Sequence, residues 1–167
     1  MGAIKLFEQD GHSYTLMEGF GGGEMVPTNQ VLIYSGNEGI LLDPGGHKVH
    51  YDLMNEISAT IPINNLKYLF FSHQDPDIVA AMNAWLMLTE AEAYISKLWI
   101  RFVPHFGVDE LMISRLKPIP DEGMKFKLGE RELLFIPAHF LHSEGNFQVY
   151  DPTSKILFSG DQFCSEW

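Results

Sequence analysis

The sequence predicts an α+β fold that forms one domain over residues 1–167. Its first half mixes β-rich runs with helical patterns, and its second half contains mostly short β-rich runs separated by turn residues. A length of 167 residues and a hydrophobic content of 46% are enough for a single core of respectable size. This order of elements is consistent with a sandwich built from two halves.

The N-terminal part predicts two β-hairpins. Residues 4–8 and 13–17 flank Asp10-Gly11, a dipeptide typical of a tight turn. Residues 29–34 and 39–42 form the second pair. The glycine-rich stretch 18–24 between the hairpins lacks the GxxxxGK[ST] pattern of a phosphate-binding loop, so we expect a flexible loop there.

Two helices and a buried strand follow. Apolar residues spaced for one helix face predict a helix over residues 50–61, which Pro62 ends. Residues 66–71 end in an apolar run typical of a buried strand. Directly after this strand, Ile78 begins a second helical pattern that continues to about Leu88.

The rest of the chain is predicted to be mainly β-structure. Short helices are expected at residues 97–106, where Pro104 interrupts the pattern, and at residues 108–113. The predicted strands are 93–96, 116–119, 125–128, 132–136, 147–150 and 155–159.

Composition excludes several classes of function. The 22 acidic and 11 basic residues give a net charge of −11, and no cluster of Lys or Arg is long enough to follow a phosphate backbone, so nucleic-acid binding is not expected. The longest apolar runs are far too short to cross a bilayer, and Met1 to Lys5 does not resemble a signal peptide. The single cysteine, Cys164, permits no internal disulfide. We therefore expect a cytoplasmic protein without a membrane anchor.

The most informative stretch lies between the buried strand and the second helix. It places one imidazole and two carboxylates, those of His73, Asp75 and Asp77, within five residues. Metal sites favour strand ends, because a rigid strand fixes ligands that a loop could not. The alternative is a capped helix start, because Asp is a good N-cap and carboxylates are stabilised at a helix N-terminus.

Two other predicted strands also end in residues that can bind metals. The strand ending at Ile136 is followed by His139 and His142, and the last predicted strand is followed by Asp161. Neutral imidazoles and ionised carboxylates suit zinc, iron or manganese. Taken alone, His142 is more often a hydrogen-bonded loop residue. Asp161 has a similar explanation as a turn residue after Gly160, but a buried strand seldom ends in an uncompensated acid.

The order His-x-Asp-x-Asp, then a histidine loop, then Gly-Asp resembles the metallo-β-lactamase superfamily. Asp43, in Leu41-Leu42-Asp43-Pro44-Gly45, is similar to an early Asp turn of that superfamily that usually supports the metal loop without binding metal. The resemblance extends from about Gln30 to Phe163. It implies an αββα metallo-β-lactamase-like sandwich in which the C-terminal part of the second half is missing.

One detail of the motif favours iron. Hydrolases of the superfamily typically carry His-x-His-x-Asp-His, whereas Asp75 and Ile78 stand at the second and last histidine positions here. A carboxylate in place of an imidazole hardens the donor set, which favours iron over zinc. This variant, the Ala138-His139-Phe140-Leu141-His142 loop and the Ser159-Gly160-Asp161 turn resemble flavodiiron proteins and the related oxygen-binding diiron proteins.

The resemblance implies a site with two iron ions, with zinc or manganese as alternatives. His73, Asp75 and His142 would hold one iron, Asp77 would hold the other, and Asp161 would bridge them. The resemblance further implies that His139 supports the site without binding metal. Trp85 and Phe140 are the candidates for the walls of a dry apolar pocket, and no catalytic residue is assigned.

The superfamily's last ligand is a histidine well beyond the Gly-Asp turn, and this sequence ends six residues after Asp161. Three alternatives are open: the sequence is a fragment, a second subunit of a homo-oligomer completes the site, or the second metal is weakly held or absent. The expected function is a non-haem diiron protein that binds dioxygen or nitric oxide for sensing or reduction, which includes reductase-like oxidoreductases. A metal-dependent hydrolase and a metal-poor interaction module are the rival interpretations.

Overall fold

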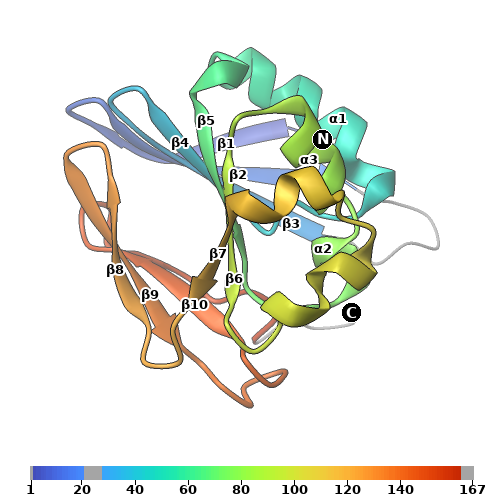
Figure 1. Ribbon diagram of the computed structural model, residues 1–167. Coiled ribbons are helices and arrows are strands. Elements are labelled where there is room, and N and C mark those ends of the chain that lie inside the picture. Colours follow the sequence, from blue (N-terminus) through green and yellow to red (C-terminus); the bar gives the residue numbers. More distant parts are fainter. Residues whose placement is uncertain (1, 21–27, 163–167) are drawn as a thin grey trace.

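The computed structural model describes residues 2–20 and 28–162 and contains two β-sheets packed face to face (Figure 1). Among these residues the larger sheet has seven strands, in chain order β1 (Gly2–Gln9), β2 (His12–Phe20), β3 (Thr28–Ser35), β4 (Glu38–Leu42), β5 (Leu66–Phe71), β6 (Glu92–Ser96) and β7 (Leu116–Ile119). The smaller sheet has the order β11-β10-β9-β8, with β8 (Met124–Leu128), β9 (Arg131–Pro137), β10 (Phe147–Asp151) and β11 (Ile156–Phe158).

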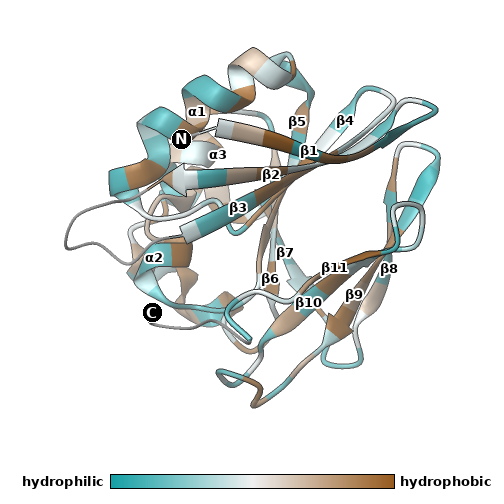
Figure 2. Cartoon of the chain, turned by 180° about the vertical axis from the view of Figure 1, so that it is seen from behind, coloured by the Kyte–Doolittle hydropathy of each residue, from teal (hydrophilic) through white to brown (hydrophobic). Residues whose placement is uncertain are grey.

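Helices cover the outer face of the larger sheet (Figure 1). The α-helices are α1 (His47–Thr60), α2 (Pro76–Val79) and α3 (Met82–Leu88), and the 3₁₀-helices are η1 (Ile63–Asn65), η2 (Ile100–Phe106) and η3 (Glu110–Arg115). In Figure 2, α1 is mainly hydrophilic with hydrophobic interruptions, as expected for a helix with one face on the core. The described helices are all too short or too polar to span a membrane.

Strand direction decides where the loops gather. The first four strands of the larger sheet are antiparallel, whereas β4, β5, β6 and β7 run parallel to one another. Parallel strands bring their C-terminal ends to the same edge, so the loops after β4 and β5 meet there. The backbone N–H of Phe147, where β10 begins, donates to the carbonyl of Ser72 at 3.0 Å, which brings the β9–β10 loop to this edge too.

Side chains of the central strands alternate between two cores. Leu41 and Leu69 pack with the helices on one side of the larger sheet. Ile40 and Phe70, their neighbours in sequence, pack between the two sheets with Phe135 of β9. This period of two allows a central strand to be apolar on both faces.

A buried pair of ionisable side chains joins the sheets at the end away from these loops. His12 Nε2 lies 2.7 Å from Asp151 Oδ2, and both side chains are fully buried. Ser154 Oγ donates to the same carboxylate oxygen at 2.6 Å, and the backbone N–H of Thr153 donates to the other oxygen at 2.9 Å. The Asp151 carboxylate therefore has partners for both of its oxygens.

The predicted α+β sandwich is confirmed, and its elements differ mainly at their boundaries. Both N-terminal hairpins form, and the helix predicted over residues 50–61 begins three residues earlier, at His47. The second predicted helix is divided into α2 and α3 at Ala80-Ala81. The two short helices beyond residue 97 are 3₁₀-helices, and Pro104 lies inside the first of them. Residues 21–24 of the glycine-rich stretch and Cys164 lie outside the described residues.

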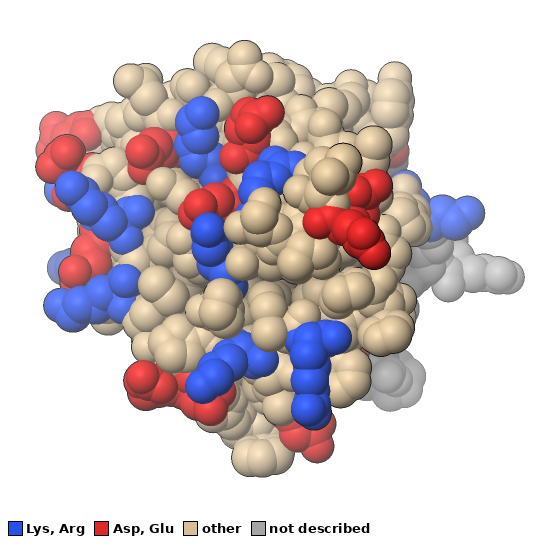
Figure 3. Space-filling model, viewed as in Figure 1, with Lys and Arg blue, Asp and Glu red and all other residues tan. Residues whose placement is uncertain are grey.

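Basic and acidic side chains are interspersed on the face shown in Figure 3. Surface side chains of the chain also form ion pairs, such as Lys117 with Glu92 at 3.2 Å and Lys125 with Glu132 at 3.1 Å. No extended basic area is visible on this face, in keeping with the net charge of −11.

Candidate metal centre

Strand β5 delivers the first group of candidate ligands. After its buried end, Ser72 and His73 are both fully buried, and Pro76 then begins helix α2. Asp75 is the N-cap residue of α2, but its side chain makes no capping hydrogen bond. Its Oδ2 atom instead lies 3.5 Å from His73 Nε2 and 3.3 Å from His142 Nε2. This carboxylate is therefore directed at the two imidazoles and makes no capping hydrogen bond.

His142 reaches the site from the β9–β10 loop, which has an unusual backbone. His142 has φ +84° and Phe140 has φ +64°, in the left-handed region that costs a non-glycine residue about 1 kcal/mol or more. The loop holds this shape by internal hydrogen bonds: Phe140 N donates to Ser143 O at 3.0 Å, and Asn146 Nδ2 donates to Leu141 O at 2.8 Å. Such strain is concentrated at functional sites.

Asp161 reaches the site because the residue before it is glycine. Gly160 has φ +58°, and a Cβ atom at this position would lie 3.0 Å from Ser72 Oγ and 3.2 Å from Ser72 Cβ. The close approach of the two loops brings Asp161 Oδ2 to 3.6 Å from His73 Nε2.

These side chains surround a small volume that suits a metal ion. One ligand atom from each of His73, His142 and Asp161 lies within 4.8 Å of the others, and the Asp75 carboxylate contacts both imidazoles. His73 Nε2 is buried and has no hydrogen-bond partner among the described residues. Separations of 3.3–3.6 Å leave room for an ion bound about 2 Å from each atom.

The burial of His73 favours its neutral form. Burial lowers the pKa of His73, and this effect outweighs the nearby carboxylates Asp161 and Asp75, which act in the opposite direction. A neutral imidazole is the form that binds a metal. The donor set of two imidazoles and two carboxylates fits iron, zinc or manganese.

Asp43 holds the loop that follows β5 by two hydrogen bonds from Ser72. It follows β4 with φ +50°, its Oδ1 accepts from Ser72 N at 2.7 Å, and its Oδ2 accepts from Ser72 Oγ at 2.6 Å. Burial raises the pKa of Asp43 to about 7, although the hydrogen bonds from Ser72 act to lower it. These contacts place Asp43 beneath the loop that carries His73 and Asp75, as the resemblance implied.

Asp77 and His139 lie outside the group formed by the other candidates. Asp77 is in the first turn of α2 with its backbone beside Gly46, and its charge acts on the pKa values of both Asp43 and His73. His139 Nε2 lies 2.8 Å from the carbonyl oxygen of Asp121, which is not one of the candidate ligands. The expected apolar wall at Phe140 is also absent, because this side chain is 78% exposed.

Sequence reasoning missed Gln74, which connects two of the loops. Gln74 Nε2 donates to Asp75 Oδ1 at 3.2 Å, which leaves Oδ2 facing the imidazoles. Gln74 Oε1 accepts from Ser143 Oγ, in the loop of His142, at 3.3 Å. A lone glutamine has no pattern in sequence that marks such a role, because both partners are brought to it by the fold.

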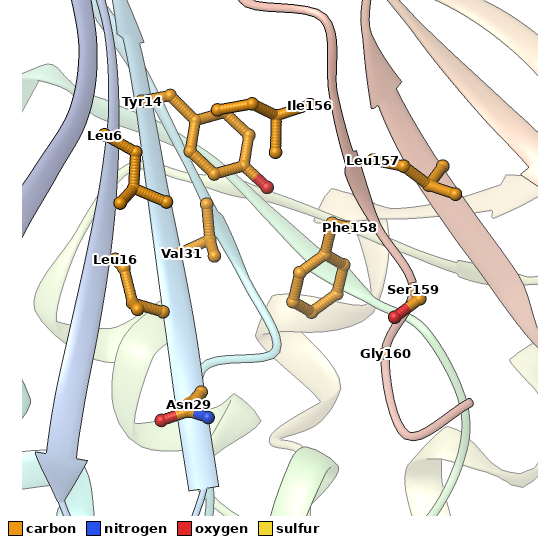
Figure 4. A pocket seen from close by; sticks show the side chains of 10 residues that line it. All are labelled: Leu6, Tyr14, Leu16, Asn29, Val31, Ile156, Leu157, Phe158, Ser159 and Gly160. Carbon is orange, nitrogen blue, oxygen red and sulfur yellow. The ribbon is translucent and has the colours of Figure 1, made fainter. Parts of the chain in front are cut away.

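A cavity of about 230 Å³ ends beside the candidate metal centre. Figure 4 shows it between strands β1–β3 and strand β11, with Tyr14, Val31 and Phe158 facing one another across it. Ser159 and Gly160 form its end, directly before Asp161. Its lining is mostly apolar, and it lies on the side of the molecule where β1 and β11 are the edge strands of their sheets.

Comparisons with solved structures agree with this fold. The chain is 41% identical to the structure described as "Peroxy diiron species of chemotaxis sensor ODP", with a TM-score of 0.85, over 96% of this chain and 64% of that chain. It is 40% identical to the apo state of the chemotaxis sensor ODP from T. denticola, with a TM-score of 0.80, over 94% and 62%. The metallo-beta-lactamase SMB-1 shares the fold at 18% identity, with a TM-score of 0.68, over 89% and 57%.

Sequence comparisons found a curated relative and a matching family model. The anaerobic nitric oxide reductase flavorubredoxin of Pectobacterium carotovorum is 25% identical over 130 residues, which are 74% of this chain and 24% of the relative. The chain therefore spans under two thirds of the solved sensors and about a quarter of this relative. The family model described as "ODP family beta lactamase" matches residues 26–167.

Proposed function

The chain belongs to the family described as ODP family beta lactamase, and from this membership we propose that it is a non-haem diiron protein that binds dioxygen for sensing. The observation that carries the proposal is the buried His73 Nε2 atom, which has no hydrogen-bond partner within residues 2–20 and 28–162 and faces His142, Asp75 and Asp161. A buried polar atom without a partner costs about 1–3 kcal/mol, and a bound cation would remove that cost. The sensor that is 41% identical is described as a diiron species.

The proposed ligand roles follow the positions of the side chains. His73, Asp75 and His142 would hold one iron, Asp161 would contribute to both iron sites, and Asp77 would contribute to the second from α2. When bound, two ferrous ions would supply the electrons for dioxygen chemistry. The protein contributes fixed orientations: Gln74 holds the Asp75 carboxylate, and the hydrogen-bonded β9–β10 loop holds His142.

We also propose that residues 1–167 form a single domain. The core between the two sheets supports this, because it contains side chains from both halves of the chain.

The ligand, the activity and the oligomeric state each have an alternative within the proposal. Nitric oxide is the alternative ligand, and reduction is the alternative to sensing. A second subunit that completes the site would appear as a dimer whose iron content per chain exceeds that of the monomer.

Iron loading followed by exposure to air tests the proposal. We expect about two ferrous ions per chain, and an absorption band in the near-ultraviolet to visible range when air is admitted to the anaerobic protein. His142→Ala should lower iron affinity at least about tenfold. His139→Ala is the matched control, because it removes an imidazole from the same loop that bonds only the backbone at Asp121.

Three outcomes would count against the proposal. Absence of iron uptake would favour an interaction module. Zinc-dependent ester or lactam turnover without the oxygen-dependent band would favour a hydrolase. Equal loss of iron in the His139→Ala and His142→Ala variants would show that the β9–β10 loop matters only for folding.

A further inference from the structure

We propose that Ser72 is a positioning residue that selects the tautomer of His73 and so keeps the Nε2 lone pair directed at the metal centre. The role of this tautomer in metal binding rests on the diiron function proposed above. The tautomer itself can be measured in the metal-free chain. The proposal starts from one buried hydroxyl group between two partners. Ser72 Oγ lies 2.6 Å from Asp43 Oδ2 and 2.8 Å from His73 Nδ1.

Counting protons decides the direction of both hydrogen bonds. An ionised carboxylate can only accept, so the short contact with Asp43 uses the single proton of the Ser72 hydroxyl. The hydroxyl oxygen can then only accept from His73, which requires the ring proton to be on Nδ1. A neutral imidazole with its proton on Nδ1 has its lone pair on Nε2.

The opposite arrangement is unfavourable in this geometry. If Ser72 donated to His73 Nδ1 while Asp43 was ionised, two oxygen atoms 2.6 Å apart would face each other without a proton between them. The observed distances therefore favour the Nδ1–H tautomer.

The surroundings leave the hydroxyl group little freedom to change partners. Ser72 is fully buried, and its backbone N–H is bonded to the other oxygen of the same Asp43 carboxylate. Gly160 packs against it so closely that a Cβ atom there would lie 3.0 Å from Oγ. Metal-binding histidines are commonly oriented by a hydrogen bond to a carboxylate. Here the hydroxyl group of Ser72 lies between the His73 imidazole and the Asp43 carboxylate.

Nitrogen NMR of histidine in the metal-free protein tests the tautomer directly. With ¹⁵N-labelled histidine at pH 8.5, where Asp43 is ionised, we expect a protonated, pyrrole-type Nδ1 and an unprotonated, pyridine-type Nε2 for His73. Asp43→Asn is the decisive variant because it keeps the shape of the side chain. Its amide would donate to Ser72 Oγ, the hydroxyl would donate to Nδ1, and the proton of His73 would move to Nε2.

Metal affinity provides a second measurement. With zinc or ferrous iron as the probe, Ser72→Ala should bind about 10- to 100-fold more weakly than the wild type. Ser154→Ala is the matched control, because it removes a hydroxyl group that also donates to a buried carboxylate, that of Asp151, at the end of the molecule away from the metal-binding loops. Circular dichroism would confirm that each variant is folded.

The outcomes separate this proposal from the proposed function. A proton on Nε2 of His73 in the wild type, or an unchanged tautomer in Asp43→Asn, would overturn the role of Ser72. The expected tautomer in a protein that takes up no iron would overturn the diiron function and leave the positioning role intact. If Ser72→Ala fails to fold, the isosteric Asp43→Asn variant still gives the answer.

Discussion

Gly160 is a residue whose smallness allows the metal centre to assemble. Its φ of +58° places it in a region that L-residues rarely adopt, and its Cα faces the Ser72 side chain. Two penalties therefore apply to any larger residue: backbone strain at Gly160 and a collision with the loop that carries His73. The second penalty acts on the site, because either Asp161 or Ser72 must move.

Gly160→Ala should weaken iron binding about tenfold or more while the protein remains folded. Gly36→Ala is the matched control, because Gly36 has φ +64° and nothing within 4 Å of its added Cβ atom. Both variants should lose about 1 kcal/mol of unfolding free energy from backbone strain, as measured by urea denaturation. Equal iron affinity in the two variants would show that the contact with Ser72 is unimportant.

At the level of single residues, some members of the candidate site could be predicted from the sequence and others could not. His73, Asp75, His142 and Asp161 could be selected from the sequence because each follows a β-rich run and carries a metal-binding side chain. Ser72 and Gln74 could not, because serine and glutamine are common in loops, and their roles depend on partners supplied by distant segments. The separation of Asp77 from the group was equally hidden, since it depends on how Pro76 starts helix α2.

Among the elements, the C-terminal end of α3 depends on a single guanidinium group. Arg115, at the end of η3, donates to the carbonyl oxygens of Thr89 at 2.6 Å and Ala91 at 3.3 Å. It also donates to the carbonyl oxygen of Leu86, in the last turn of α3. One side chain thus satisfies carbonyl groups that the end of a helix leaves without partners.

Arg115→Ala should lower the free energy of unfolding by about 2 kcal/mol, because hydrogen bonds from a charged group to partly buried carbonyls are lost. Lys127→Ala is the control, since Lys127 is an exposed residue on β8 and its loss should change stability by less than about 0.5 kcal/mol. Urea denaturation followed by circular dichroism would compare the two. A change in Arg115→Ala no larger than that in Lys127→Ala would contradict the role assigned to Arg115.

Among the secondary-structure elements, hairpins and strands could be predicted well, because the residue patterns that indicate them lie within a few positions of the chain. Asp10-Gly11 marks the first turn, and apolar runs mark the buried strands. The division between α2 and α3 was missed because Ala80 and Ala81 are good helix formers and packing overrides their preference. The short 3₁₀-helices η2 and η3 share apolar spacing with α-helices, so the sequence did not distinguish the two types.

At the scale of the whole molecule, the buried pair of His12 and Asp151 links the two sheets. Burial raises the pKa of Asp151, but hydrogen bonds from His12 and Ser154 have the larger combined effect, so its pKa lies below the ordinary value. A carboxyl group whose pKa is lowered by folding stabilises the native state at pH values above its unfolded pKa of about 3.9. That contribution is lost as the pH falls through the folded pKa.

Metal-free wild-type protein should therefore lose stability more steeply than Asp151→Asn when the pH falls from 5 to 3. At neutral pH the substitution should lower the free energy of unfolding by about 3 kcal/mol, because the buried His12 imidazole loses its carboxylate partner. Urea midpoints measured across this pH range would give both quantities. Parallel curves for the two proteins would show that Asp151 does not account for the acid sensitivity.

The distance in sequence between these two residues has a consequence for folding rate. His12 and Asp151 are separated by 139 positions, so bringing them together costs chain entropy, and we expect their contact to form late in folding. An interaction that is absent from the transition state affects unfolding rather than folding. In stopped-flow experiments Asp151→Asn should therefore unfold faster while its refolding rate stays close to that of the wild type. We therefore expect the pair to lengthen the lifetime of the native state once it has formed.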